Sequence, residues 1–348
     1  MTKRFAELDG LRIVAAMLVL MSHLVEVPET NYFGPIGVLF DGGVAVLIFF
    51  VLSGFVITGL LTRELDRTGS IALRQFYLRR ALRIWPASYA YILVALVCVS
   101  LHFATARPQN FILAATHLWN YSFTLTRADP SSQGFTIFGH FWSLALEEQF
   151  YWAWPLAMLL LRGRATKVLI VIIAIMPVVR IVSYVLFPFS RGQLTAMFHT
   201  GIDPIALGAL LSLSGERLRP QVARLSPWLF YANLAFLLVL CPVLEAHLRG
   251  FWTVTYGRTL EAASAGLLII ALIHGPQTRL AWLLRTWPMQ FGGRISYSLY
   301  VWQQLFTLRM SIFPQGALMA IALSLAAATA SYYLIELPFL RLKDRLAP

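Results

Sequence analysis

Long apolar runs recur along the chain, separated by short segments that contain charged residues, proline or glycine. Ten of these runs are close to the ~20 residues that a membrane-spanning helix needs. They lie at 8–27, 38–62, 84–104, 138–161, 168–188, 199–214, 226–245, 253–274, 288–309 and 314–337. Because the apolar residues are continuous rather than alternating, they favour helices over the strands of a membrane barrel. The pattern predicts an all-α, polytopic membrane helix bundle of about ten transmembrane helices, with residues 1–348 forming a single domain.

The composition agrees with a membrane protein. Hydrophobic residues make up 58% of the 348 positions and charged residues 13%, whereas a soluble domain is about 45–50% apolar and about 25% charged. An ordinary soluble protein is therefore excluded. Both cysteines, Cys98 and Cys241, lie in apolar runs, where we expect small buried side chains rather than a disulfide. No Cys/His spacing typical of a metal site occurs in the sequence, so we expect no metal.

The net charge of +12 is compatible with a nucleic-acid partner or a membrane surface. The positions of the basic residues decide between them. With the N-terminus inside, 21 of the 28 lysines and arginines fall on inner segments or inner span ends, and six fall on outer segments. This asymmetry follows the positive-inside rule. We expect both termini in the cytoplasm, a retained first span rather than a cleaved signal peptide, membrane lipid as the surroundings, and no nucleic acid.

Two ionisable residues share the first run. His23 follows Arg12 by eleven residues, which is close to three helical turns, so both side chains point to one side about 16 Å apart. Arg12 is expected near the cytoplasmic face and His23 past the midplane. Ionisable groups inside spans are functional candidates. A simple packing role for His23 is the alternative.

A basic pair stands where an inner loop is expected to enter the third span. Arg80 and Arg83 are three residues apart, so they are neighbours on one helix face. Arginine offers two parallel donors to phosphate oxygens, which makes the pair a candidate phosphate clamp that Arg12 joins at the same depth. The alternative is a cluster that sets topology and contacts anionic lipid.

Carboxylates also occur within spans. Ser143 and Glu147 are one turn apart and share a helix face, while Glu148 points about 100° away. This geometry excludes the paired carboxylates of a glycosidase. A structural ion pair with an arginine is the alternative for Glu147. Asp203 and Glu336, at the ends of two other runs, are candidates for structural counter-ions.

In this order, the segments resemble the acyltransferase-3 family of integral membrane O-acyltransferases. The resemblance runs from about residue 6 to 341, and six motifs carry it: LDGLR at 8–12 with His23, FFVLSGF at 49–55, Arg80-x-x-Arg83 before Ile84-Trp85-Pro86, Trp142-Ser143-Leu144 with Glu147, SYSLY at 296–300 with Trp302, and ELPF at 336–339. Two positions depart from the family pattern: Leu47 stands where an acidic residue is frequent, and Gln303 where histidine is frequent. Members fused to an extracytoplasmic domain are longer, so the chain looks like the stand-alone form.

The resemblance implies an O-acetyltransferase of the bacterial inner membrane. It would move an acyl group, usually acetyl, from cytoplasmic acyl-CoA to a hydroxyl of an extracytoplasmic glycan or glycoconjugate. Acetyl-CoA is then the donor substrate, and no cofactor is bound permanently. Arg12, Arg80 and Arg83 are expected to bind its phosphates. The sequence leaves open a succinyl or other acyl donor and the oligomeric state.

The resemblance also suggests roles inside the bundle. His23 is expected to act as general base on the acceptor hydroxyl, with a covalent acyl-histidine as the alternative, and Glu147 is expected to orient it. Lining residues of the tunnel are expected to be Trp142, Ser143, Tyr297 and Asp203. Acceptor selectivity is expected in the outer segments 28–38, 105–137 and 188–200, with a short interfacial helix at 109–119. The alternative function is a transporter or flippase for a glycan or lipid-linked sugar.

Overall fold

The computed structural model describes residues 5–25, 33–127, 132–161, 163–224, 227–248, 250–275, 278–307 and 316–345. Within these ranges the chain forms helices and irregular segments and no β-strand, which confirms the predicted all-α class. The α-helices described are α1 (Ala6–Val25), α2 (Gly42–Thr68), α3 (Leu73–Ser100), α4 (Pro108–Ala115), α5 (Ser122–Thr126), α6 (Gln133–Phe138), α7 (Phe141–Leu161), α8 (Ala165–Leu186), α9 (Phe198–Gly201), α10 (Asp203–Ala223), α11 (Pro227–Ala235), α12 (Cys241–Leu248), α13 (Arg258–His274), α14 (Arg279–Leu284), α15 (Trp287–Thr307), α16 (Ala317–Ser331) and α17 (Leu337–Arg345).

Seven helical stretches within the described residues are long and apolar enough to cross a membrane. They are Ala6–Val25, Gly34–Thr68, Leu73–Ser100, Ala165–Leu186, Pro227–Leu248, Thr253–His274 and Ala317–Arg345. This finding makes the protein a multi-pass membrane protein. The other three predicted runs are helical as well: they correspond to α7, α15 and the apolar part of α10, Asp203–Gly215. The count of ten spans and the cytoplasmic placement of both termini stay predictions.

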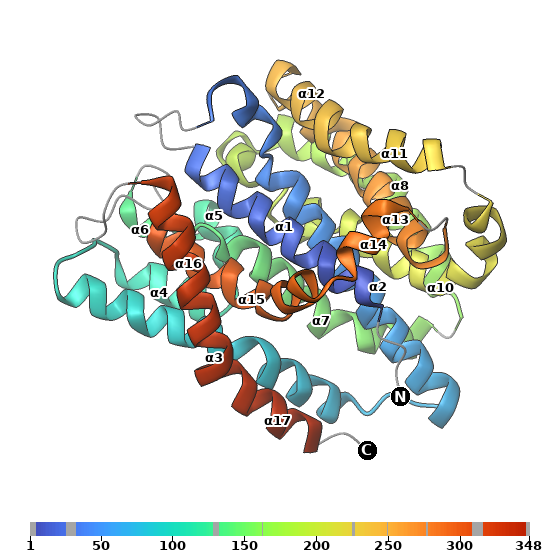
Figure 1. Ribbon diagram of the computed structural model, residues 1–348, viewed down its shortest axis with the longest axis horizontal. Coiled ribbons are helices and arrows are strands. Elements are labelled where there is room, and N and C mark those ends of the chain that lie inside the picture. The colour runs from blue at the N-terminus through green and yellow to red at the C-terminus, as the bar shows by residue number, and fades with distance from the viewer. Residues whose placement is uncertain are drawn as a thin grey trace.

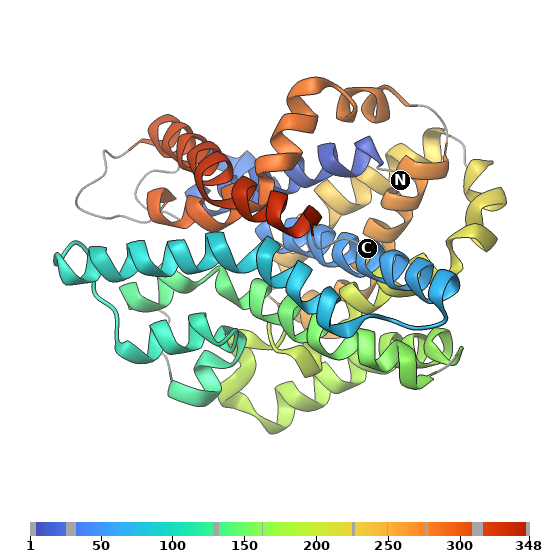
Figure 2. The same cartoon turned by 90° about the horizontal axis from the view of Figure 1, so that it is seen from below.

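The bundle has an inner set of helices and an outer set (Figure 1). α2 packs against both α1 and α10, α1 against α15, and α10 against α13. α3, α8 and α16 lie further out and expose apolar side chains, such as Leu318 at 84% and Val185 at 61%. Such surfaces are stable where lipid rather than water covers them. The short helices that follow α3 gather on one side of it (Figure 2).

Glycine allows the central helices to approach closely. A Cβ atom on Gly54 of α2 would lie 1.9 Å from the carbonyl oxygen of Ile205, and one on Gly208 of α10 would lie 2.0 Å from the carbonyl oxygen of Val51. Each glycine is therefore covered by the backbone of the other helix. In membranes, where apolar side chains gain little by leaving lipid, such backbone contact is a principal source of helix association.

α1 and α15 are held together in the same manner and run in the same direction. A Cβ atom on Gly293 of α15 would lie 2.3 Å from the carbonyl oxygen of Asp9, near the beginning of α1. Further along the pair, His23 near the end of α1 contacts Gln303 of α15. The close packing at Gly293 therefore fixes which part of α15 faces His23.

The third helix begins earlier than predicted. α3 starts at Leu73 rather than at 84, so Arg80 and Arg83 lie within the helix and not where a loop enters it. Its first turn also buries an apolar side chain, that of Phe76. A hydropathy pattern detects only the part of a helix that is apolar all round, and it misses an amphipathic extension.

The long predicted loop is mostly helical. α4 (Pro108–Ala115) confirms the short helix expected at 109–119, but α5 also falls within 105–137 and α6 begins there. Trp119, between α4 and α5, is fully buried and anchors this segment to the bundle. Parts of two predicted outer segments, 28–32 and 128–131, lie outside the described residues.

Candidate active site

A cavity of about 310 Å³ brings together most of the residues singled out in the sequence. We call it the arginine cavity. Its functional side chains come from helices distant in the chain: Arg12 of α1, Ser53 of α2, Arg80 and Arg83 of α3, Ser143, Glu147 and Tyr151 of α7, Tyr297 and Tyr300 of α15, and Lys343 of α17. Four basic side chains therefore line one small space.

The arginines differ in their partners. Arg12 Nη1 forms an ion pair with Asp9 Oδ1 at 3.0 Å. Arg80 lies over the ring of Tyr151, with its Cζ 5.7 Å from the ring centroid, and Arg83 is exposed. Neither Arg80 nor Arg83 has a carboxylate partner among the described residues. Their donors are thus available to an anion, and a phosphate suits the planar guanidinium.

The two adjacent glutamates of α7 lie in different surroundings. Glu147 accepts hydrogen bonds from Ser53 Oγ at 2.7 Å and from Tyr151 Oη at 3.3 Å. Glu148 is 2% exposed and accepts a hydrogen bond from Trp85 Nε1 at 3.4 Å. Glu147 lines the arginine cavity and Glu148 does not, as their helical separation predicts.

His23 lines a second, larger cavity of about 720 Å³, which we call the His23 cavity. His140 and Trp142 contribute to the same wall. The His23 Nδ1 atom lies 2.9 Å from Gln303 Oε1. An amide oxygen only accepts, so Nδ1 carries the proton. In the neutral ring, Nε2 is then the unprotonated nitrogen and is able to accept a proton from a hydroxyl.

Tyr300 of α15 separates the two cavities and lines both of them, as does Val46. The Tyr300 hydroxyl forms a hydrogen bond with Ser143 Oγ and donates another to the His140 carbonyl oxygen at 3.0 Å. The arginines and His23 therefore face opposite sides of one shared wall. A thin chain that passes this wall would connect an anion held by the arginines with the imidazole.

Comparison with known families adds an independent finding. A family model described as an acyltransferase domain, acyltransferase 3, matches residues 5–336.

The chain belongs to the acyltransferase-3 family.

Two bacterial relatives show where this acyltransferase-3 chain aligns. The peptidoglycan O-acetyltransferase OatA of Listeria monocytogenes is 28% identical over 97% of the chain. The O-acetyltransferase OatA of Staphylococcus aureus is 28% identical over 95% of the chain. The chain spans about half of the length of these curated relatives, 56% in both cases. No solved structure matches it.

The remaining predicted residues of this acyltransferase-3 chain lie in three places. Tyr297 lines the arginine cavity and its hydroxyl donates to the Ile84 carbonyl oxygen at 2.6 Å. Trp142 lines the His23 cavity and Ser143 lines the arginine cavity. Glu147 is not brought to His23, whose ring is held by Gln303 instead. Asp203 lines neither cavity.

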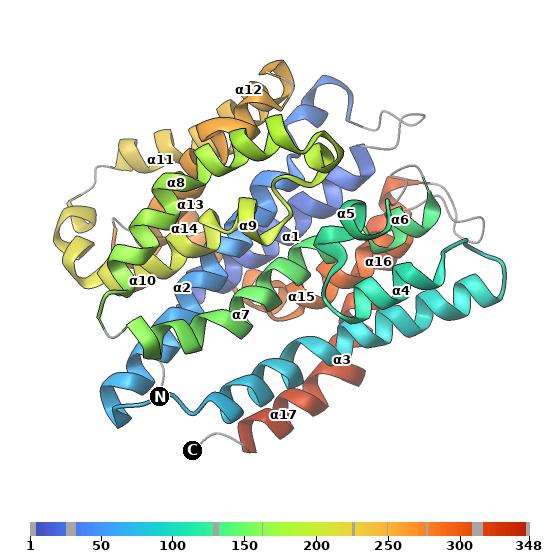
Figure 3. The same ribbon diagram turned by 180° about the vertical axis from the view of Figure 1, so that it is seen from behind.

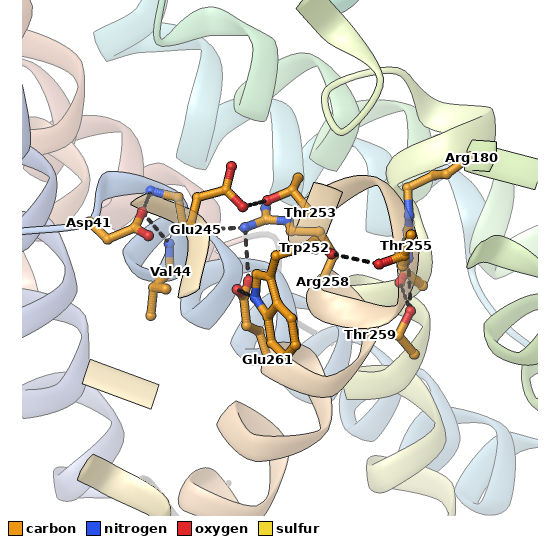
Figure 4. Close-up of polar contacts among 12 residues, drawn as sticks. Asp41, Val44, Arg180, Glu245, Trp252, Thr253, Thr255, Arg258, Thr259 and Glu261 are labelled. Carbon is orange, nitrogen blue, oxygen red and sulfur yellow. Dashed lines mark hydrogen bonds and ion pairs between the residues drawn. The ribbon is translucent and has the colours of Figure 1, made fainter. Parts of the chain in front are cut away.

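Asp203 belongs to a buried polar cluster at the start of α10. Its Oδ1 atom lies 2.8 Å from Arg180 Nη1, and both side chains are almost fully buried. Asp203 Oδ2 accepts a hydrogen bond from Thr259 Oγ1 at 2.7 Å, and Arg180 Nη2 also reaches Thr259. Figure 4 shows Arg180 and Thr259 beside the Arg258–Glu261 pair. This arrangement fits the counter-ion alternative for Asp203.

Replacing Asp203 by asparagine is expected to destabilise the protein by about 3–5 kcal/mol, because it leaves the Arg180 charge buried without compensation. Thermal unfolding in detergent measures this loss of stability. Unfolding is detected by the reaction of a thiol dye with Cys98 and Cys241 as they become exposed. The exposed Asp66→Asn change is the matched control. Unchanged unfolding of Asp203→Asn together with reduced acyl transfer would instead support the predicted tunnel role.

Sequence reasoning missed several residues of the site. Gln303 was noted only as a departure from the family pattern, yet it holds His23. Ser53 and Tyr300 lie in the recognised motifs without an assigned role, and His140 precedes the Phe141–Trp142 pair. Their partners are far away in the chain, 280 residues in the case of His23 and Gln303, so no local spacing revealed the contacts. The available signal was a polar residue inside an otherwise apolar run.

Replacing Gln303 by leucine is expected to lower kcat for acyl transfer about tenfold, because a neutral hydrogen bond is worth about 0.5–1.5 kcal/mol and the ring loses its fixed tautomer. KM for acetyl-CoA should not change, since Gln303 lies outside the arginine cavity. Gln303→Glu retains an acceptor oxygen and should restore most of kcat. Equal losses in both variants would show that Gln303 matters for packing rather than for holding His23.

Proposed function

We propose that the protein is a membrane O-acyltransferase that moves an acetyl group from acetyl-CoA to a hydroxyl of an extracytoplasmic glycan or glycoconjugate. The observation that carries this proposal is the meeting of two unlike cavities at Tyr300. One is lined by Arg80 and Arg83, which have no carboxylate partner among the described residues, and the other by an imidazole whose Nδ1 contacts Gln303 Oε1, so that Nε2 is the unprotonated nitrogen of the neutral ring. The names of the relatives, which are O-acetyltransferases, support acetyl as the acyl group.

In this proposal the arginine cavity receives the phosphates of CoA from the cytoplasm. The end of α2, the beginning of α3 and α17 lie at one end of the bundle (Figures 1 and 3). This end is rich in arginine and lysine, including Arg63, Arg67, Arg74, Arg341 and Lys343. The positive-inside rule then favours a cytoplasmic position for it, and we propose the cytoplasmic membrane of a bacterium as the location.

The chemistry assigned to His23 is general base catalysis. Nε2 takes the proton of the acceptor hydroxyl while its oxygen attacks the thioester carbonyl. The carbon–sulfur bond then breaks, and the imidazolium returns the proton to the CoA thiolate. Glu147 is proposed to order the donor side of the wall through Ser53 and Tyr151. The reaction therefore needs no reactant besides acetyl-CoA and the acceptor.

The test is acyl transfer by the purified protein in vesicles, with acetyl-CoA labelled in the acetyl group and a panel of bacterial glycans as acceptors. Label should appear on glycan as an alkali-labile ester, and only when acetyl-CoA is present. A succinyl-CoA arm identifies the acyl specificity. Movement of glycan across the vesicle membrane without acetyl-CoA, and without ester formation, would contradict the proposal and support the transporter alternative.

A further inference from the structure

The two cavities carry opposite charge. Arg12, Arg80, Arg83 and Lys343 line the arginine cavity, with one carboxylate, Glu147. The described residues that line the His23 cavity include two carboxylates, Asp41 and Glu245, and neither lysine nor arginine. A ligand that enters the second cavity therefore meets a different electrostatic environment from one that enters the first.

Both carboxylates are held in place at the cavity wall. Asp41 caps α2, where its Oδ1 accepts hydrogen bonds from the amides of Gly43 and Val44 at 2.7 and 3.1 Å. Glu245 Oε2 accepts a hydrogen bond from Thr253 Oγ1 at 2.5 Å. Figure 4 shows Asp41 beside Val44 and Glu245 beside Thr253. Both side chains are half-buried, and nothing in these contacts neutralises their charge.

One cation, Arg258, lies behind the part of the wall that Gly43 forms. Arg258 donates to the Gly43 carbonyl oxygen at 3.1 Å and pairs with Glu261 Oε2 at 3.4 Å. It does not line the cavity. Three carboxylates, those of Asp41, Glu245 and Glu261, therefore surround a single arginine, Arg258. The field inside the His23 cavity is therefore unfavourable for an anion.

Two buried polar side chains also line the cavity and have ring nitrogens without a partner in the described structure. His140 lines it, is 2% exposed, and has no hydrogen-bond partner at either ring nitrogen. Trp119 also lines it and is fully buried with an unpartnered Nε1. Buried polar groups without partners cost free energy. A hydroxyl both donates and accepts, so it suits an imidazole and an indole N–H alike once a ligand reaches them.

The rest of the lining suits a sugar ring. Trp142, Phe135 and Phe40 supply apolar surface, and Gln193 and Gln304 supply amides. A few polar groups on a mostly apolar wall are typical of small-molecule sites, and about 720 Å³ lies within their usual range of roughly 300–1,000 Å³.

We infer that the His23 cavity accepts a sugar unit that is uncharged or carries an amine, and that Asp41 and Glu245 reject sugars bearing a carboxylate or phosphate. This inference rests on the proposed function, because it assigns the acceptor to this cavity. Rejection by like charge is an efficient source of specificity. The donor phosphates are kept to the arginine cavity by the same division of charge.

The test is saturation-transfer NMR on the protein in vesicles without acetyl-CoA. The probes are matched methyl glycosides of glucose, glucosamine and glucuronic acid. The first two should bind, and the glucuronide should bind about tenfold more weakly or not at all. Glu245→Gln should reduce this discrimination several-fold, while the exposed Asp66→Asn change should leave it intact. His140→Ala should weaken binding of the glucoside.

Two results would overturn the inference: binding of the glucuronide as tight as that of the glucoside, or no saturable binding of either the glucoside or the glucosaminide. Titration of acetyl-CoA on the same sample distinguishes failure of this inference from failure of the proposed function. If acetyl-CoA binds and reacts but the glucuronide is the preferred sugar, only the inferred acceptor class is refuted. A sample that binds the glucoside but neither binds nor consumes acetyl-CoA refutes the acyltransferase.

Discussion

Acyl transfer by the His23→Ala protein is expected to fall by about 10²–10⁴-fold, the usual contribution of a positioned general base. Affinity for acetyl-CoA should stay the same, because His23 lies outside the arginine cavity. The physical reason is that the acceptor hydroxyl then has no group to take its proton as it attacks the thioester. Initial rates with labelled acetyl-CoA give kcat, and equilibrium binding of CoA gives the affinity.

The matched control for His23 is His247→Ala on α12. His247 is exposed, and its ring bonds only the Val243 carbonyl oxygen of its own helix. This variant should transfer at the wild-type rate. Normal transfer by His23→Ala would remove the imidazole from the reaction. A labelled acetyl group that remains on His23 after denaturation would replace general base catalysis by the covalent alternative.

The second large effect is expected at the donor phosphates. Arg83→Ala, and in the same way Arg80→Ala, should raise KM for acetyl-CoA by about 10- to 100-fold, since a hydrogen bond to a charged group is worth about 1.5–3 kcal/mol. kcat at saturating donor should change little, because the arginines contact the donor far from the thioester. Steady-state kinetics over a range of acetyl-CoA concentrations separates the two parameters.

A truncated donor makes this prediction specific. S-acetylpantetheine carries the thioester and the arm but no phosphate, so its poorer KM should be the same for wild type and for Arg83→Ala. Arg74→Ala on the same helix is the control, because Arg74 is exposed and does not line the arginine cavity. If Arg83→Ala bound acetyl-CoA as tightly as wild type, or lost affinity for S-acetylpantetheine equally, the phosphate role would be refuted.

The helices were predicted well and their ends less well. Runs of about 20 apolar residues specify helices in lipid because backbone groups have no other partners there, and each of the ten predicted runs overlaps a described helix. The beginning of α3 was missed because Leu73–Arg83 mixes arginine with buried Phe76, a pattern that a hydropathy window assigns to a loop. α5 and α6, with five and six residues, are too short for a periodic signal.

The candidate site divides in the same way. The helical spacing of Arg12 and His23, and of Arg80 and Arg83, could be derived within single helices. The partner of His23 could not, because it depends on the register between α1 and α15 that close packing at Gly293 sets. Local spacing placed Glu147 on the same face as Ser143, and both line the arginine cavity. It contained no information on which neighbouring helix that face meets.

Tyr300, at the shared wall, also matters for the electrical potential across the membrane. Moving one elementary charge through a potential of 100 mV releases about 2.3 kcal/mol. An open aqueous passage between the two cavities would therefore dissipate the membrane potential. Tyr300, tied to Ser143 and to the His140 carbonyl oxygen, occupies the position where such a passage would run. On the proposed function, an acyl carrier crosses half of the bilayer while protons and ions do not follow it.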